Sequence, residues 1–175
     1  MDQRTTLPNS PLPLNHVDRK HEGAPLTEEK RKLFQQIVGC AGWASFNAKP
    51  EAMVASSFLA QHCHNPGEEH LKLGHDLIGY LYKTREQGIR FHGSSEVLDK
   101  GFPRRKKLGA YVDANLGGGA FDERSRSCYV MQLNGGMKSM KIMKQTVVAR
   151  STGQSEMKAL AMLAQQLQFC TDLLS

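Results

Sequence analysis

Two carboxylates in the second half of the chain occupy positions from which they could hold a metal ion. Asp113 ends a segment of alternating apolar and polar residues, just before the run Gly117-Gly118-Gly119, and Glu156 lies near the start of the last helical pattern. If that helix packs across the sheet, we expect the two carboxyl groups to face each other across the sheet–helix interface. Mg²⁺ takes oxygen ligands and keeps several waters for a phosphate substrate. Two such ions about 3.5–4 Å apart would stabilise the attacking and leaving oxygens of phosphodiester hydrolysis.

The same two residue types also have ordinary structural roles. An Asp at the end of a strand is commonly a turn residue, and a Glu in the first turn of a helix complements the helix dipole. The residues alone leave metal binding and a structural role open for both Asp113 and Glu156.

A basic run, Arg104-Arg105-Lys106-Lys107, is the candidate nucleic-acid-binding segment. The net charge of +6 and the pI near 9.2 favour polyanionic partners, because lysine and arginine release condensed counterions when they neutralise phosphates. A solvated basic linker explains the same four residues equally well.

The histidines and cysteines are weaker candidates for a metal site. The spacing of Cys63 and the nearby histidines matches neither half of a known zinc motif, so we expect surface or helix-packing roles for these histidines, which are His62, His64, His70 and His75. The four cysteines lie far apart without a CxxC pair, which indicates reduced thiols.

Neither a membrane span nor a secretory signal is indicated. No apolar run approaches the roughly 20 residues that a bilayer span requires, and Met1 to Ser10 lack the basic-then-apolar order of a signal peptide. We therefore expect an intracellular protein with no membrane partner.

The first half of the chain predicts three helices joined by tight turns. The first spans roughly 28–46, with Thr27 as its N-cap and an apolar stripe that comprises Leu33, Phe34, Ile37, Val38 and Ala41. The second begins at Pro50 and ends before Asn65-Pro66-Gly67. The third runs from Glu68 to about Thr84, with Leu71, Ile78, Leu81 and Tyr82 as its apolar residues.

The second half predicts three strands and a helix. Alternation indicates a strand from Leu108, and two further strands, Cys128–Leu133 and Met137–Met143, flank Asn134-Gly135-Gly136. Asn-Gly is a strong hairpin signal because the two-residue turn needs positive φ. A last helix starts near Ser151, where Ser151 and Gln154 form a capping-box pattern.

Several motifs with a fixed order are distributed between about residues 28 and 175. In the helical half they are Phe34 to Phe46, Lys49-Pro50-Glu51, Pro66 to His70 and Gly79 to Thr84; in the second half they are Val112 to Gly118, Arg124 to Gly135 and Ser139 to Leu160. Their order resembles the C-terminal part of copia-type retrotransposon Pol polyproteins, where the end of the reverse transcriptase is followed by a ribonuclease H-like domain. The order of several motifs is far more specific than any one motif.

The resemblance assigns roles to the two carboxylates. Asp113 matches the family's first catalytic Asp and Glu156 its catalytic Glu, which implies that both are Mg²⁺ ligands. The family's third acidic residue lies on a strand after the last helix, and Asp172 does not match it. The polymerase motif Y-V-D-D is absent, so polymerisation is not supported. Further departures from the family pattern are Asn115, Leu116, Met140 and Gln154.

The expected fold class is α+β, a small helical bundle followed by a partial ribonuclease H-like β-β-β-α unit. The expected division is a disordered leader (1–26), a thumb-like helical segment (27–84), a basic linker (85–107) and the partial ribonuclease H-like domain (108–175).

Two functions are consistent with the sequence. One is a fragment of a copia-like reverse transcriptase/ribonuclease H that ancestrally hydrolysed the RNA strand of RNA–DNA hybrids with Mg²⁺ and is inactive as this chain. The other is a non-catalytic remnant or co-opted domain that binds nucleic acid or protein. The expected partners are an RNA–DNA hybrid or another nucleic acid and the rest of a Pol polyprotein.

Overall fold

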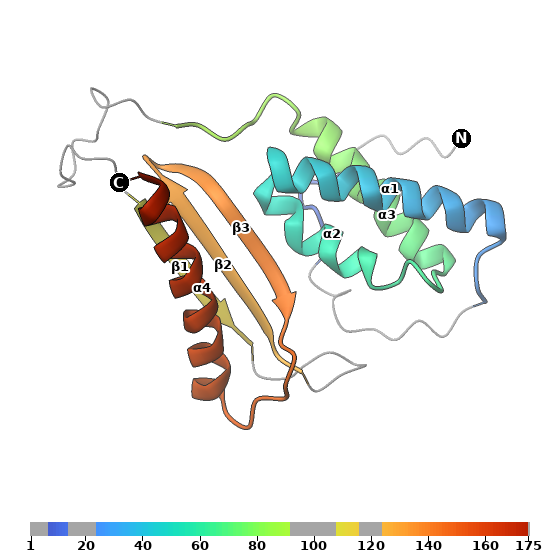
Figure 1. The fold of residues 1–175 in the computed structure, drawn as a ribbon. Helices are drawn as coiled ribbons and strands as arrows, with labels where there is room; N and C mark the ends of the chain where they lie inside the picture. The colour runs from blue at the N-terminus through green and yellow to red at the C-terminus, as the bar shows by residue number, and fades with distance from the viewer. Residues whose placement is uncertain (1–6, 14–23, 92–107, 116–123, 175) are drawn as a thin grey trace. The chain divides into compact units, whose positions relative to one another are not determined.

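The computed structural model describes residues 7–13, 24–91, 108–115 and 124–174 (Figure 1). The chain divides into two compact units, Met1–Gly88 and Ile89–Ser175. In the described residues, the first unit is helical, and the second combines a three-stranded antiparallel sheet with one helix. The α+β class expected from the sequence is confirmed. The boundary at Gly88 falls inside the range 85–107 that was expected to form a linker.

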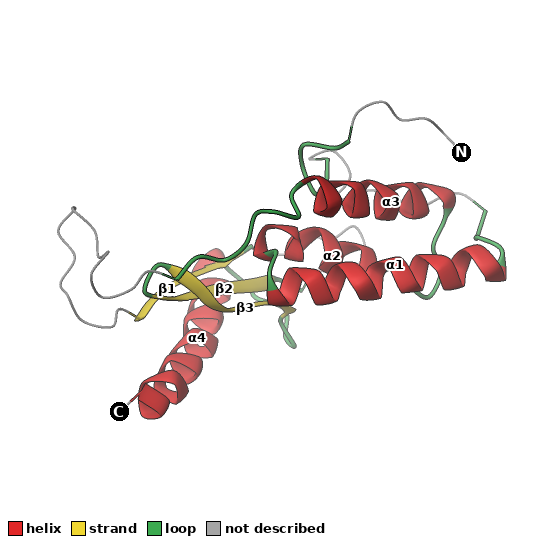
Figure 2. Cartoon of the chain, turned by 90° about the horizontal axis from the view of Figure 1, so that it is seen from above, coloured by secondary structure: helices red, strands yellow, loops and turns green. Residues whose placement is uncertain are grey.

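The described part of the first unit contains three α-helices and one 3-10 helix, which Figure 2 shows from above. They are α1 (Glu28–Asn47), η2 (Pro50–Ala52), α2 (Met53–Ala60) and α3 (Glu68–Lys83). Helix α1 begins after Thr27, whose side-chain oxygen accepts a hydrogen bond from the Lys30 N–H. Helix α3 begins after Gly67, whose N–H donates to Nδ1 of the buried His70 at 3.0 Å. The three helices predicted from the sequence are confirmed.

Fully buried side chains from each helix form the core of this unit. Phe34 of α1, Leu59 of α2 and Leu77 of α3 are each 0% exposed. Helices α1 and α3 approach closely at Gly74, where an added Cβ would lie 3.0 Å from Cγ2 of Ile37.

The buried faces of the helices differ in part from the predicted ones. Leu33 of α1 and Ile78 and Tyr82 of α3 are exposed, whereas Leu73 and Tyr80 of α3 are buried. The neighbouring helices cover only one side of α1 and α3, and apolar residues on the other side stay in solvent.

Parts of the predicted leader contact the helices. Leu12 and Leu26 are half-buried and pack against the helical core. The Leu26 N–H also donates to the Pro66 carbonyl at 3.1 Å. Within the range 1–26, which was expected to form a disordered leader, residues 7–13 and 24–26 thus bury apolar surface through these two leucines. The rest of the range 1–26 lies outside the described residues.

In the second unit three strands form a sheet in the order β1-β2-β3. The strands are β1 (Leu108–Ala114), β2 (Arg126–Leu133) and β3 (Gly136–Lys144), and both pairings are antiparallel. Between β2 and β3, Asn134 has φ 51° and Gly135 has φ 79°. Positive φ at both central residues is what the two-residue hairpin turn requires. The predicted hairpin is confirmed.

Helix α4 (Thr152–Leu174) covers one face of this sheet (Figure 1). Leu163 and Cys170 of α4 are buried with Tyr129 and Met131 of β2, and the inward residues of β1 pack around them. The helix begins after Ser151, whose Oγ accepts from the Gln154 N–H at 3.2 Å. The predicted start of the helix is confirmed, although Gln154 Oε1 accepts from the Arg150 N–H rather than from Ser151.

Within the described ranges, no helix has both the length and the apolar character needed to cross a membrane.

Candidate functional site

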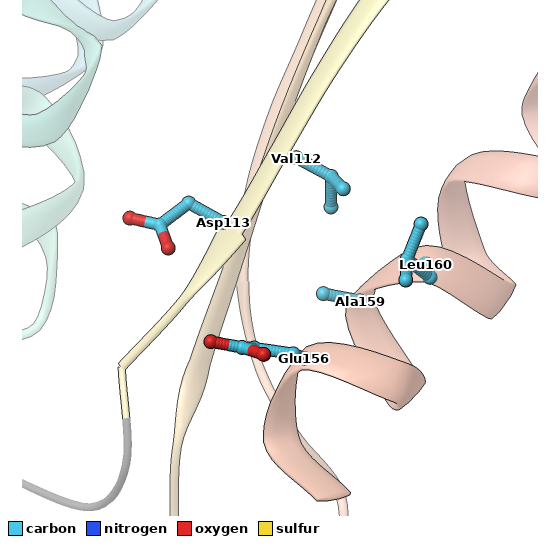
Figure 3. Close-up of a pocket in the computed structure, with 5 residues that line it drawn as sticks. All are labelled: Val112, Asp113, Glu156, Ala159 and Leu160. Atoms are coloured by element: carbon cyan, nitrogen blue, oxygen red, sulfur yellow. The ribbon is translucent and has the colours of Figure 1, made fainter. Parts of the chain in front are cut away.

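Asp113 and Glu156 line one small cavity at the edge of the sheet. The cavity holds about 160 Å³ and is lined by Val112, Asp113, Glu156, Ala159 and Leu160 (Figure 3). Strand β1 supplies the first two residues and the first turns of α4 supply the other three. The fold therefore brings together the two carboxylates that the sequence singles out, although they are 43 positions apart (156 minus 113).

The two carboxyl groups do not point at each other. Successive residues of a strand face opposite sides of the sheet, and Val112 is directed toward α4 while Asp113 projects from the other side of β1 (Figure 3). Glu156 reaches from α4 toward the strand. The two residues thus meet at one edge of the sheet, instead of facing each other across the sheet–helix interface as expected.

The surroundings of Asp113 confirm which face it occupies. Its Oδ1 accepts a hydrogen bond from the Ala114 N–H at 2.9 Å. Its cross-strand partner on β2 is Cys128, on the face away from α4. Partial burial, and then the negative charge of Asp113, raise the pKa of the Cys128 thiol above its usual value.

Replacing Asp113 by Asn is expected to increase the rate at which iodoacetamide alkylates Cys128 near pH 8. The substitution removes a negative charge that raises the thiol pKa, so a larger fraction of Cys128 is thiolate at a given pH, and the thiolate is the nucleophile. Mass spectrometry of the alkylated peptides would give the rate at Cys128 apart from the other three cysteines. Glu156→Gln is the matched control and should leave this rate unchanged. Equal acceleration in both variants would contradict the placement of Asp113 on the Cys128 face.

A buried polar cluster fixes the start of α4 on the sheet beside this cavity. Gln145, which follows β3, donates from Nε2 to Ser127 Oγ of β2 and to the Ser155 carbonyl of α4, both at 2.9 Å. Ser155 Oγ in turn donates to the Asn115 carbonyl, just after β1, at 2.8 Å. These bonds tie α4 to the chain around all three strands, one residue before Glu156 and two residues after Asp113.

Sequence reasoning missed this cluster. Gln145, Ser127 and Ser155 are each less than one-tenth exposed, yet Ser and Gln are mostly surface residues, so nothing in the sequence singled them out. The Oε1 atom of Gln145 is buried without a hydrogen-bond partner within the described part of the chain. The orientation of the Gln145 side-chain amide follows from its bond to Ser155. Because the Ser155 carbonyl can only accept, the atom that faces it must be the donor Nε2, and Oε1 lies on the opposite side of the amide.

The donor set does not fit a pair of divalent cations. Across residues 7–13, 24–91, 108–115 and 124–174, no group of three or more His, Cys, Asp or Glu residues is placed to hold a metal ion. Two exposed carboxylates could hold one hard cation loosely, with water completing its shell. A second ion would need further negative charge to offset the repulsion between the two.

The other sequence candidates do not add to this site. Arg104, Arg105, Lys106 and Lys107 lie outside the described residues. His70 and His62 stack with ring centroids 4.0 Å apart in the helical unit, and Phe58 packs edge-on to His62. The helix-packing role predicted for these two histidines is confirmed.

Comparison with known proteins identifies relatives of this sequence. No protein-family model and no solved structure matches the chain. It is 29% identical over 170 residues to the retrovirus-related Pol polyprotein from transposon RE1 of Arabidopsis thaliana, a match that covers 97% of this chain and 11% of that polyprotein. It is 25% identical over 172 residues to the transposon Ty1-GR3 Gag-Pol polyprotein of Saccharomyces cerevisiae, which covers 89% of this chain and 9% of that polyprotein.

A third relative is much shorter. The secreted RxLR effector protein 161 of Plasmopara viticola is 28% identical over 142 residues, which are 81% of this chain and 94% of that protein. Against the polyproteins, by contrast, the chain spans only about a tenth of their length. Over most of its length, therefore, the chain is a homologue of part of the copia-type retrotransposon Pol polyproteins.

Proposed function

We propose that the chain carries a partial ribonuclease H-like unit that ancestrally hydrolysed the RNA strand of RNA–DNA hybrids with Mg²⁺ and that does not cleave them by itself. The observation that carries the proposal is the cavity shared by Asp113, from a strand, and Glu156, from the start of the helix that covers the sheet. Homology to Pol polyproteins over most of the chain supports the same reading. The segment 27–84 then corresponds to the thumb-like end of a reverse transcriptase.

The proposed inactivity follows from the number of the carboxylates. Among the described residues, Asp113 and Glu156 are the only carboxylates that line the cavity. Phosphodiester hydrolysis by paired ions requires ligands that hold both ions a fixed distance apart. Two carboxylates alone cannot impose that distance.

A non-catalytic binding module is the second candidate. The match to the RxLR effector supports it, because a region homologous to most of this chain makes up 94% of that protein. A stretch of this length is thus found apart from a Pol polyprotein. Such a module would bind nucleic acid or protein without cleaving either.

Purified wild-type chain is expected to give no Mg²⁺-dependent cleavage of a labelled RNA–DNA hybrid and only weak, salt-sensitive binding. The assay compares wild type with Asp113→Asn and Glu156→Gln, with Mg²⁺ and with chelator, beside an active two-metal ribonuclease H as positive control. Weak binding that is unchanged in both variants, with no cleavage, supports the inactive remnant. Metal-dependent cleavage that both substitutions abolish would overturn the proposed inactivity and establish an enzyme.

A further inference from the structure

Another cavity of the sheet unit lies between α4 and strands β2 and β3. It holds about 270 Å³, and residues from both strands, from the segment after β3 and from α4 line it: Ser127, Met143, Gln145, Thr146, Lys158 and Met162. Lys158 and Met162 are four residues apart, so they lie on the same side of α4. Ser127 and Met143 are cross-strand partners. All of these walls belong to one compact unit.

The polar side chains that line this cavity have hydrogen-bond donors to spare. Lys158 Nζ donates to the Val147 carbonyl at 3.3 Å, which uses one of its three N–H groups. Among the described residues, no Asp or Glu forms an ion pair with Lys158. Ser127, 2% exposed, accepts from Gln145 Nε2 through its Oγ and keeps its own hydroxyl hydrogen as a donor. Thr146 adds a second hydroxyl, so the cavity offers an anion one cation and two hydroxyl donors.

Gln145 does not oppose an anion in this cavity. Its Nε2 donates to Ser127 Oγ and to the Ser155 carbonyl, and its Oε1 is buried, so an occupant does not reach that oxygen. None of the lining residues is Asp or Glu. An anion beside Lys158 therefore meets no like charge.

The rest of the lining favours an aromatic ring. Met143 and Met162 contribute two thioethers, and a thioether sulfur packs favourably against the edge of an aromatic ring. A cavity of about 150 Å³ is enough for benzene. A cavity of about 270 Å³ therefore has room for one ring and a short chain that ends in a small charged group.

We propose that this cavity binds a small aromatic carboxylate. The ring packs against the Met143 and Met162 thioethers, and the carboxylate accepts hydrogen bonds from Lys158 Nζ and from the Ser127 and Thr146 hydroxyls. Hydrogen bonds between charged groups and carboxylates are the strong ones, so the carboxylate supplies much of the affinity. The proposal goes beyond the ancestral hydrolysis, because it involves neither Asp113 and Glu156 nor a metal ion.

The size and the chemistry of the cavity favour this occupant over macromolecules. No amino-acid side chain carries both an aromatic ring and a carboxylate, so a second copy of the chain or another protein would have to insert two side chains into about 270 Å³. A nucleic acid presents its phosphates along a continuous backbone, and its bases have polar edges that two thioethers do not pair with. An inorganic anion would leave both thioethers without a contact.

The probe is 3-phenylpropionate, titrated into the whole chain with ¹³C-labelled methionine methyl groups. The ring is expected to shift the methyl signals of Met143 and Met162, which single Met→Leu variants assign, and to leave that of Met53 in the helical unit in place. Two analogues separate the two halves of the ligand. 3-Phenylpropanol keeps the ring without the charge and propionate keeps the charge without the ring, and each is expected to bind about tenfold more weakly or worse.

Lys158→Met is expected to weaken binding of 3-phenylpropionate about tenfold and to leave the affinity for 3-phenylpropanol unchanged, because only the acid uses the ammonium group. Lys138→Met removes the same charge from β3 outside the cavity and is the matched control, which should bind like wild type. Thr146→Val, at an exposed position, tests the site without altering its charge and should weaken the acid about threefold.

Four results would overturn the proposal. They are unmoved Met143 and Met162 methyl signals at saturating 3-phenylpropionate, equal affinity for the acid and the alcohol, and a folded Lys158→Met protein that binds the acid like wild type. The fourth is a shift of the same two methyl signals when the chain alone is concentrated, or when an RNA–DNA hybrid is added, since the cavity would then hold a second copy or a nucleic acid.

Discussion

Replacing Arg104, Arg105, Lys106 and Lys107 by alanine is expected to remove most of the salt dependence of binding to an RNA–DNA hybrid. If each of the four neutralises one phosphate, log affinity falls with log salt at a slope of about −3.6, so wild-type affinity drops roughly 100-fold between 50 and 200 mM salt. The variant should show little of this drop and bind weakly throughout. Fluorescence anisotropy with a labelled hybrid at four salt concentrations measures both slopes.

The control for this experiment removes positive charge elsewhere. Alanine at Lys138, Lys141 and Lys144 on β3 takes away three charges from described positions in the same unit, and it should leave most of the salt slope intact. Hybrids of different sequence should bind alike, because phosphate contacts carry no base information. An unchanged slope in the variant at 104–107 would show instead that the run is only a solvated linker.

Phe34→Ala is expected to lower the free energy of unfolding of the helical unit by about 3–5 kcal/mol. The ring is 0% exposed in the cluster that joins α1, α2 and α3. Its removal loses the transfer free energy of the ring and leaves a cavity that the helices fill only in part. Urea unfolding followed by far-UV circular dichroism reports mainly on this unit, because it holds three of the four α-helices in the described residues.

Leu33→Ala provides the comparison on the same helix. Leu33 precedes Phe34 and is 43% exposed, so its truncation should cost less than about 1 kcal/mol. Similar losses for the two variants would mean that the helices do not pack around Phe34 as described. The predicted difference rests on which side of α1 the other two helices cover.

Local signals explain which elements could be predicted from the sequence. The turn at Asn134-Gly135 depends on two residues that tolerate positive φ, and the start of α4 depends on a Ser whose oxygen caps its own helix. The alternation in β1 likewise reports one buried face, with Ala110 and Val112 in the core beneath α4. Each of these features depends on residues that are close together in the chain, so it can be predicted from the sequence alone.

Only the tertiary structure decides which apolar residues are covered and where the carboxylates point. Ile78 is as apolar as Leu77 in the sequence, but α1 and α2 lie on the Leu77 side of α3. Asp113 and Glu156 reach the same cavity because Gln145 and Ser155 seat α4 at one position on the sheet. The period of two along β1 directs Val112, rather than Asp113, toward α4, so the Asp113 side chain leaves β1 on the other side. Packing between segments that are far apart in the chain sets these side-chain directions, so they cannot be predicted from the sequence alone.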